Sequence, residues 1–281
     1  MNKQILFSVI IPAFNRKDFL KKAITSVLNQ SYRNLELIVV DDGSSDGTDF
    51  LINSIKDERI LFLKQSNHGV SHARNTGIRR AKGDFFAFLD SDDSWTEKKL
   101  EKAVKYIEEF SEISIFHTEE VWYRNGALLN QKKKHKKPTG FVYKKALPLC
   151  CISISTAVVK KEVFENIGIF DENLQACEDY DFWLRATNRY EVKLIPEYLT
   201  IKDGGRPDQL SSRIWGLDRF RIHSLEKMLL SSSLNPENYK ATLQEFQKKC
   251  HIFTLGAAKR GKSKESELYT KLASKYRPKN I

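Results

Sequence analysis

Three carboxylates follow a short apolar run near the end of the first third of the chain. Residues 85–89 are apolar, and Asp90, Asp92 and Asp93 come directly after them. An apolar run of this length suits a buried strand, but carboxylates cannot enter the core unless their charge is compensated. The acids must therefore lie at an edge or cleft, where Mg²⁺ or Mn²⁺ would suit their oxygens. A solvated acidic turn that caps the next helix explains this segment equally well.

Two further polar clusters also follow apolar runs. Residues 12–15 follow a run at 7–11, and residues 41–44 follow a run at 35–40. In open parallel sheets, ligands gather beyond the carboxyl ends of the strands. If these runs are neighbouring parallel strands, their polar ends share one edge with residues 90–93. This convergence favours a functional site over a merely solvated turn.

The elements that position these clusters alternate between strand and helix patterns. Strands are predicted at 7–12, 35–40, 60–63 and 84–89, and helices at 17–30, 46–54, 70–81 and 96–110. This alternation indicates right-handed βαβ units and an α/β fold with a mainly parallel sheet.

The second half has a less regular pattern. Strands are predicted at 113–117, 152–159, 190–195 and 198–202, a hairpin at 125–126, and helices at 177–188, from 213 onward, at 238–250 and at 264–275. The lysine run that ends at Pro138 predicts a solvated loop. The last 70 or so residues predict a helical tail.

The composition is that of a soluble globular protein, with 41% hydrophobic and 30% charged residues. No apolar run approaches the roughly 18 residues that a membrane span needs. The N-terminal residues show no signal-peptide pattern. The four cysteines have no metal-ligand spacing, so we expect small buried thiols and a cytoplasmic protein.

The net charge of +11 is unevenly distributed. Residues 206–281 hold 16 Lys and Arg against 7 Asp and Glu, a net +9, and residues 131–145 hold seven Lys and no acid, a net +7. The rest of the chain therefore carries −5. Basic regions of this kind suit an anionic partner such as a membrane surface or a phosphorylated lipid carrier, although a solvated basic face needs no partner. No nucleic-acid recognition motif accompanies the charge, so we expect no nucleic-acid partner.

Six pieces of sequence, in this order and at these separations, resemble the family 2 glycosyltransferases, which are inverting enzymes of the GT-A fold with nucleotide-sugar donors. The pieces are SVIIPAFN (8–15), VDDGSSDGT (40–48), ARNTG (73–77), GD (83–84), DSDD (90–93) and EDYDFWLR (178–185). The resemblance implies a Rossmann-like GT-A domain at 1–212. Its nucleotide-binding half would span about 1–118 and its acceptor-binding half about 119–212, followed by a basic helical C-terminal extension at 213–281.

The resemblance also implies a site for the nucleotide-sugar donor. Its residues are Pro12, Phe14, Asn15, Asp41, Asp42, Arg74, Asp90 and Arg206. Asp42 matches the aspartate that accepts the N3–H of the base, and Arg74 matches a donor-contacting arginine. Simple alternatives are core packing for Phe14, a turn-stabilising role for Asp41 and Asp42, and a surface salt bridge for Arg74.

Asp92 matches the last aspartate of the family's DXD motif, the usual ligand of Mn²⁺ or Mg²⁺. Asp93 would contact the sugar or cap the next helix. Arg206 stands where close relatives often have a histidine, and a guanidinium binds diphosphate but cannot ligate a metal. Metal coordination would then rest on Asp92, the donor phosphates and water.

Asp179 matches the catalytic base of the family. An acceptor hydroxyl needs a carboxylate within hydrogen-bonding reach to take its proton as it attacks the sugar. Glu178 would orient that base or bind the acceptor, and Trp183 would pack in the core or stack on a sugar ring. Two acids at a helix start are also favourable through the helix dipole alone.

These residues predict a metal-dependent inverting glycosyltransferase that uses an NDP-sugar, most simply a UDP-sugar, and acts on a lipid-linked or surface glycan acceptor. A peripheral position at the inner face of the membrane fits the basic regions. The alternatives are a nucleotidyltransferase or sugar-nucleotide hydrolase on a similar sheet, and a non-catalytic glycan- or membrane-binding module.

Overall fold

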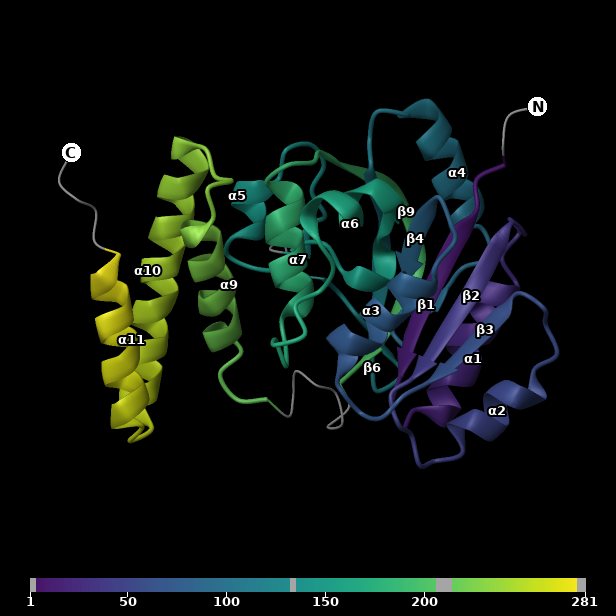
Figure 1. Ribbon diagram of the computed structural model, residues 1–281, viewed down its shortest axis with the longest axis horizontal. Coiled ribbons are helices and arrows are strands. Elements are labelled where there is room, and N and C mark those ends of the chain that lie inside the picture. Colours follow the sequence, from purple (N-terminus) through teal and green to yellow (C-terminus); the bar gives the residue numbers. More distant parts are fainter. Residues whose placement is uncertain (1–3, 132–134, 206–213, 277–281) are drawn as a thin grey trace.

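The computed structural model describes residues 4–131, 135–205 and 214–276. A mixed sheet occupies one end of the molecule, and a group of helices from the C-terminal part of the chain lies at the other end (Figure 1). The strands are β1 (Phe7–Ala13), β2 (Leu35–Asp41), β3 (Ile60–Lys64), β4 (Phe85–Phe88), β5 (Ser94–Trp95), β6 (Ile115–Arg124), β7 (Ala127–Leu129), β8 (Val158–Lys160) and β9 (Val192–Gly204).

Helices connect most of these strands and also form the C-terminal group. They are α1 (Lys17–Leu28), α2 (Thr48–Ser54), α3 (Val70–Arg80), α4 (Lys99–Glu109), α5 (Tyr143–Ala146), α6 (Lys161–Ile167), α7 (Glu178–Thr187), α9 (Asp218–Leu230), α10 (Pro236–Lys259) and α11 (Ser263–Lys275). Among the described residues, no helix is long and apolar enough to cross a membrane.

The strand order is β3-β2-β1-β4-β8-β6-β9-β5, with β7 paired to β6. The first four strands in this order are parallel, as the βαβ pattern predicted. The sheet is less parallel beyond β4, because β8 runs antiparallel to both β4 and β6, and β5 runs antiparallel to β9. Among the described residues of that half, only β6 and β9 form a parallel pair.

The sheet separates two hydrophobic clusters. Successive strand residues point to opposite faces, so Val9 and Ile11 pack in the cluster that includes α1, while Ile10 packs in the cluster that includes α3. Both faces of the parallel strands are therefore covered. This packing fixes the carboxyl ends of β1, β2 and β4 at one edge of the sheet.

Three predictions for the second half are wrong in detail. The run at 152–159 is not one strand, because Ile154–Thr156 forms a 3₁₀ turn before the short β8. The two strands predicted at 190–195 and 198–202 are one strand, β9, which passes Pro196 with a register shift in its pairing to β6. The helix α6 was not predicted at all.

The lysine run is also less solvated than predicted at its end. Lys137 is buried and forms an ion pair of 2.9 Å with Glu120, which is itself buried. Residues 132–134 lie outside the described part of the chain. The last lysine before Pro138 therefore belongs to the interior of the fold.

The C-terminal helices share a third hydrophobic cluster with α5 and α7. Tyr143, Tyr180 and Leu184 pack there against Leu225 of α9 and Phe246 of α10. The predicted helical C-terminal region is present, and it packs directly on the half of the molecule that carries α7 (Figure 1).

Candidate active site

Asp42 lies just beyond β2 and is held by an extensive set of hydrogen bonds. Its carboxylate accepts hydrogen bonds from Gln65 Nε2 at 2.7 Å, the His68 backbone N–H at 2.9 Å and the Gly69 backbone N–H at 2.8 Å. The Asp42 N–H donates to the Ala13 carbonyl at 2.8 Å. Asp42 thus joins the ends of β1 and β2 to the start of α3.

Asp41, the last residue of β2, is fully buried. One of its oxygens accepts the Ser44 backbone N–H at 2.9 Å, which is the turn-stabilising role weighed from the sequence. The other oxygen, Oδ2, has no hydrogen-bond partner in the described part of the structure. A buried carboxylate oxygen of this kind is available to orient a neighbouring polar group.

The segment after β1 turns toward the Asp42 loop. Asn15 adopts a left-handed backbone conformation (φ 50°), its N–H donates to Ser44 Oγ at 2.8 Å, and its Oδ1 accepts from Ser45 N at 2.8 Å. Pro12 is buried within β1, paired with Val40 of β2. Phe14 is 44% exposed, so core packing does not account for its ring.

Arg74 of α3 connects the two acidic segments of the sequence. Its Nη2 donates to Asp90 Oδ1 at 2.8 Å, and its Nη1 donates to Glu178 Oε1 at 2.5 Å. The guanidinium is buried and lies over the Phe170 ring, 5.5 Å from its centroid. Arg74 therefore does not form a surface salt bridge but holds the end of β4 against the start of α7.

Lys202 of β9 is a site residue that the sequence analysis missed. Its Nζ lies 2.9 Å from Asp93 Oδ2 and 3.9 Å from Asp90 Oδ2, and it donates to Ser153 Oγ at 3.2 Å. Ser155 Oγ adds a hydrogen bond of 2.6 Å to Asp93 Oδ2. No local motif marks Lys202, because the sheet brings it to these acids from more than 100 residues away along the chain.

Burial and fixed charge separate the pKa values of these groups. Burial opposes the charged form of Asp90, but Arg74 and Lys202 outweigh it and hold the Asp90 pKa below its usual value. Burial raises the pKa of Asp93 to about 7, with Lys202 acting against the rise. Burial also raises the pKa of Glu178 despite Arg74. The pKa values of Arg74 and Lys202 are both raised, because the neighbouring carboxylates outweigh the effect of burial.

Asp179 lies in the first turn of α7 and is partly exposed. Its Oδ1 accepts the Tyr180 backbone N–H at 2.7 Å, and its Oδ2 accepts the Cys150 thiol at 3.4 Å. Burial and the nearby Asp179 charge raise the pKa of Cys150 well above its usual value, so this thiol stays protonated as a donor. The carboxylate is thus oriented while its outer side remains accessible.

One predicted residue, Trp183, does not join this cluster. Trp183 is 1% exposed and packs among Phe182 and other core residues, so its ring is not available for stacking on a sugar in this conformation. Arg206 lies outside the described residues.

Asp92 is partly exposed beside these groups and offers a carboxylate to a cation. Its neighbours Asp90 and Asp93 pair with Arg74 and Lys202, respectively. Throughout 4–131, 135–205 and 214–276, no three His, Cys, Asp or Glu side chains form a ready metal cage. The donor set fits Mg²⁺ or Mn²⁺ held by a single carboxylate together with the phosphates of a bound substrate.

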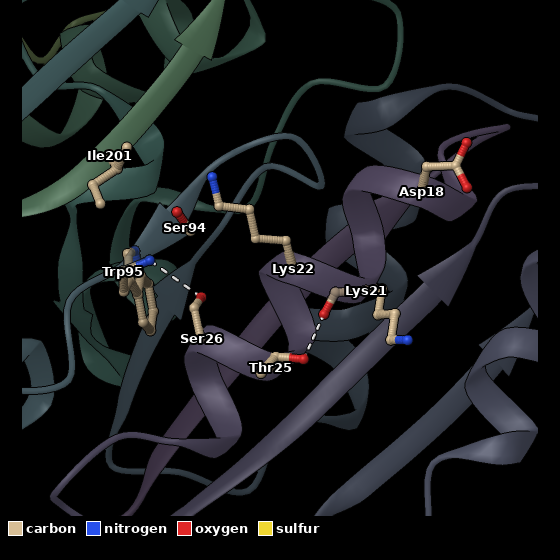
Figure 2. Close-up of a pocket in the computed structure, with 8 residues that line it drawn as sticks. All are labelled: Asp18, Lys21, Lys22, Thr25, Ser26, Ser94, Trp95 and Ile201. Atoms are coloured by element: carbon tan, nitrogen blue, oxygen red, sulfur yellow. Dashed lines mark hydrogen bonds between the residues drawn. The ribbon is translucent and has the colours of Figure 1, made fainter. Parts of the chain in front are cut away.

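A hollow of about 540 Å³ lies on the other face of the sheet, between α1 and the β5–β9 pair (Figure 2). It is lined by Lys21 and Lys22 of α1 and by Ser94, Trp95 and Ile201 of the strands. Ser94 and Ile201 are the chain neighbours of Asp93 and Lys202, but neither Asp93 nor Lys202 lines the hollow. We assign this hollow no part in the acidic site.

Comparison with known proteins identifies the family. The family model described as "Glycosyl transferase family 2" matches residues 8–168. The chain belongs to glycosyl transferase family 2. The matched segment contains the ends of β1, β2 and β4 and the helix that carries Arg74. It stops before α7, so the candidate base lies outside it.

Curated family 2 relatives come from several bacteria. The UDP-Glc:alpha-D-GlcNAc-diphosphoundecaprenol beta-1,3-glucosyltransferase WfaP of Escherichia coli is 34% identical over 71% of this chain and 78% of its own length. The putative teichuronic acid biosynthesis glycosyltransferase TuaG of Bacillus subtilis is 34% identical over 65% of this chain and 72% of its length. An uncharacterized glycosyltransferase of Rickettsia bellii is 36% identical over 67% of this chain, but the match covers only 28% of that longer protein.

Solved structures match over nearly the whole glycosyltransferase chain. S. aureus TarS 1-349 in complex with UDP-GlcNAc matches 97% of this chain and 93% of its own, with a TM-score of 0.70 and 16% identity. The mannosyltransferase PcManGT of Pyrobaculum calidifontis, in complex with GDP-Man and Mn²⁺, has a TM-score of 0.60 and 18% identity. At these identities the matches establish the fold, which is the GT-A fold with its mixed sheet and flanking helices.

Proposed function

We propose that this glycosyltransferase moves a sugar from a UDP-sugar to an acceptor hydroxyl with inversion at the anomeric carbon. The main support is the ion-pair bridge through Arg74, which ties Asp90 to Glu178, the residue next to Asp179. A donor bound at the strand ends and a base on α7 would then be held in a fixed relation. In-line displacement needs that relation, because misplacing either partner by about 1 Å can slow such a reaction about 10²-fold.

The donor site rests on groups that are already oriented. The Asp42 carboxylate retains lone pairs for the N–H of a uracil base, since its Oδ2 accepts only the Gly69 N–H. The exposed ring of Phe14 offers a face for the base. The ammonium of Lys202 and the guanidinium of Arg74 provide positive charge for the diphosphate. The name of WfaP also gives a UDP-sugar as its donor, and the TarS structure is a complex with UDP-GlcNAc.

A divalent cation, Mn²⁺ or Mg²⁺, would neutralise the charge that builds on the departing diphosphate. Asp92 is the residue that would hold it, with the donor phosphates completing its ligands. Arg74 and Lys202 stabilise charge in the same region as fixed cations that need no rearrangement during the reaction. The PcManGT complex named above contains Mn²⁺, which supports this assignment by analogy.

Asp179 would act as the general base. As the acceptor oxygen forms its bond to the anomeric carbon, the bond from that carbon to the diphosphate oxygen breaks, and the hydroxyl proton passes to the Asp179 carboxylate. Cys150 and the Tyr180 N–H orient that carboxylate. Glu178, fixed by Arg74, positions the start of α7 that carries the base.

The acceptor would belong to the synthesis of a surface polysaccharide or a lipid-linked glycan, as the names of WfaP and TuaG suggest for those relatives. The basic regions would favour a cytoplasmic enzyme at the anionic inner face of the membrane.

Replacement of Asp179 by Asn tests the assignment of the base. The amide keeps the size of the side chain but cannot take a proton, so we expect transfer to fall at least about 10²-fold. Binding of UDP with Mn²⁺, measured by calorimetry, should change less than about twofold, an energy difference well below 1 kcal/mol. The control Asp57→Asn removes an aspartate in a partly buried pair with Arg59 that includes none of the site residues, and it should leave both quantities unchanged. Transfer by Asp179→Asn near the wild-type rate would contradict the assignment.

A further inference from the structure

A pocket of about 900 Å³ lies where the start of α9 meets the end of α10. Both of these helix ends lie on the lower side of Figure 1, where α9, α10 and α11 stand side by side. We call this hollow the α9–α10 pocket. Its lining includes Trp215, Arg221, Ile252, Leu255, Lys259 and Arg260. Nothing in the proposed reaction has yet used it.

One side of the α9–α10 pocket lies close to Cys177, two residues before the candidate base. The Cys177 thiol, immediately before α7, lies 3.8 Å from the Leu217 carbonyl, and Leu217 lines the pocket. Arg221, also in the lining, lies close enough to Cys177 and Asp179 for both to act electrostatically on its guanidinium. A molecule with its hydroxyl at Asp179 could therefore extend past Arg221 into the pocket.

The pocket combines apolar surface with positive charge. Ile252 is 52% exposed and Leu255 is 50% exposed, so α10 presents two large aliphatic side chains to the pocket. Lys259 and Arg260 follow them at the exposed end of α10. The Lys262 ammonium lies over the Trp215 ring, 3.5 Å from its centroid.

The negative charge in the pocket lining is balanced by neighbouring cations. Asp218 is the one acid among the lining residues, and it pairs with Arg221 at 2.9 Å and with Lys249 at 3.5 Å. The pocket thus has a positive rim and an apolar wall. Its occupant should carry both an anionic group and a hydrocarbon chain.

We propose that the α9–α10 pocket binds the isoprenoid diphosphate portion of a lipid-linked acceptor, with the diphosphate near Arg221 and Arg260 and the first isoprene units along Ile252 and Leu255. This inference rests on the proposed function, because it supplies the carrier for the sugar whose hydroxyl reaches Asp179. A wholly polar glycan would leave the aliphatic wall in water. An anionic bilayer alone would need a basic face but no hollow close to Cys177.

Binding of farnesyl diphosphate tests the proposal without knowledge of the acceptor sugar. The full chain is titrated by calorimetry with saturating UDP and Mg²⁺, so that the donor site is filled. We expect farnesyl diphosphate to bind at least about tenfold more tightly than either inorganic diphosphate or farnesol, which corresponds to about 1.4 kcal/mol. Equal binding of inorganic diphosphate would show a simple anion site and overturn the proposal.

Two pocket variants and two matched controls locate the binding. Leu255→Asp and Arg260→Glu should each weaken farnesyl diphosphate at least about tenfold. Leu230→Asp, at the other end of α9, and Lys240→Glu, on the first part of α10, change exposed residues that do not line the pocket and should bind as wild type. Thermal melting checks that all four variants fold. Wild-type binding by both pocket variants would place the ligand elsewhere and overturn the proposal.

Vesicles separate this pocket from a general membrane surface. Binding to vesicles with about one third phosphatidylglycerol, without binding of farnesyl diphosphate, would identify a membrane-docking face and overturn the pocket proposal. UDP binding in the presence of Mg²⁺ is measured on the same samples. Absence of UDP binding would count against the proposed function, whereas farnesyl diphosphate binding tests the pocket alone.

Discussion

Lys202 places a positive charge against two of the three carboxylates that follow β4. Its pairing with Asp93 at 2.9 Å and its approach to Asp90 at 3.9 Å reduce the repulsion between the two acids. Without a nearby cation, closely spaced buried carboxylates cannot all ionise. Lys202 therefore lets this edge of the sheet hold negative charge before any donor or metal ion binds.

Replacement of Lys202 by Met should shift the pH dependence of transfer. Asp93 has a pKa of about 7, and the Lys202 charge lowers it, so removing the charge raises that pKa further. If ionised Asp93 is needed at the site, the acidic limb of kcat/KM for the donor moves to higher pH by about one unit. Lys202→Arg keeps the charge and should largely restore the wild-type profile. Rate profiles from pH 5.5 to 9.5 measure both variants, and an unmoved acidic limb in Lys202→Met contradicts this role.

The sequence predicts Asp42, Arg74 and Asp90 as site residues because each matches a short motif of the family that it resembles. Their hydrogen bonds and ion pairs could not be predicted in the same way. Arg74 pairs with Glu178 across 104 residues, and Cys150 approaches Asp179 without any motif around it. Contacts of this kind come from the packing of distant elements and leave no periodic signal in the chain.

At the scale of elements, the first four strands were predicted well because their apolar runs are continuous and alternate with helices. The run at 152–159 misled the prediction because its serines serve the tertiary structure. Ser155 binds Asp93 through its hydroxyl and accepts the Trp95 indole N–H through its carbonyl at 2.8 Å. These contacts stabilise a 3₁₀ turn where local apolar residues favour a strand.

The packing of α3 on β1 makes a glycine necessary inside a helix. A Cβ at Gly77 would lie 2.6 Å from Ile10 Cγ2, and Ile10 is fully buried beneath the sheet face. A Cβ at Gly256 of α10 would meet only the flexible Arg260 side chain, at 3.1 Å. Replacement of glycine by alanine should therefore have opposite effects on the stability of the protein at these two positions.

We expect Gly77→Ala to destabilise the protein by about 1–3 kcal/mol, because overpacking at the α3–β1 contact exceeds the gain in helix propensity. Gly256→Ala should stabilise it by about 0.5–1 kcal/mol, since alanine is the better helix former and little must move. Urea denaturation of both variants beside wild type measures the difference. Equal stability of the two variants would show that α3 can shift away from β1 at little cost.

At the scale of the whole molecule, the C-terminal helices are part of the folded core. Tyr143 donates to or accepts from Thr242 across an O–O distance of 2.7 Å, and Lys227 of α9 pairs with Asp181 of α7 at 2.7 Å. The sequence predicted helices here from their apolar spacing and a basic tail from their charge. It did not predict that they would complete the packing of α7, because the partners of an apolar helix face are not encoded locally.

Two truncations test this integration. Ending the chain at residue 213 would expose Tyr180 and Leu184, which are 1% and 0% exposed in the full chain, on the helix that carries Asp179. Each large apolar side chain that loses its cover costs about 1.5–3 kcal/mol, and several together approach the whole stability of a typical domain. We therefore expect that fragment to aggregate or to unfold at much lower temperature.

Ending the chain at residue 261 removes α11, which has no buried residue, and should lower the melting temperature by only a few degrees. Circular dichroism melts compare both fragments with the full chain, and a stable, active fragment 1–213 would mean that α7 holds its conformation without α9 and α10.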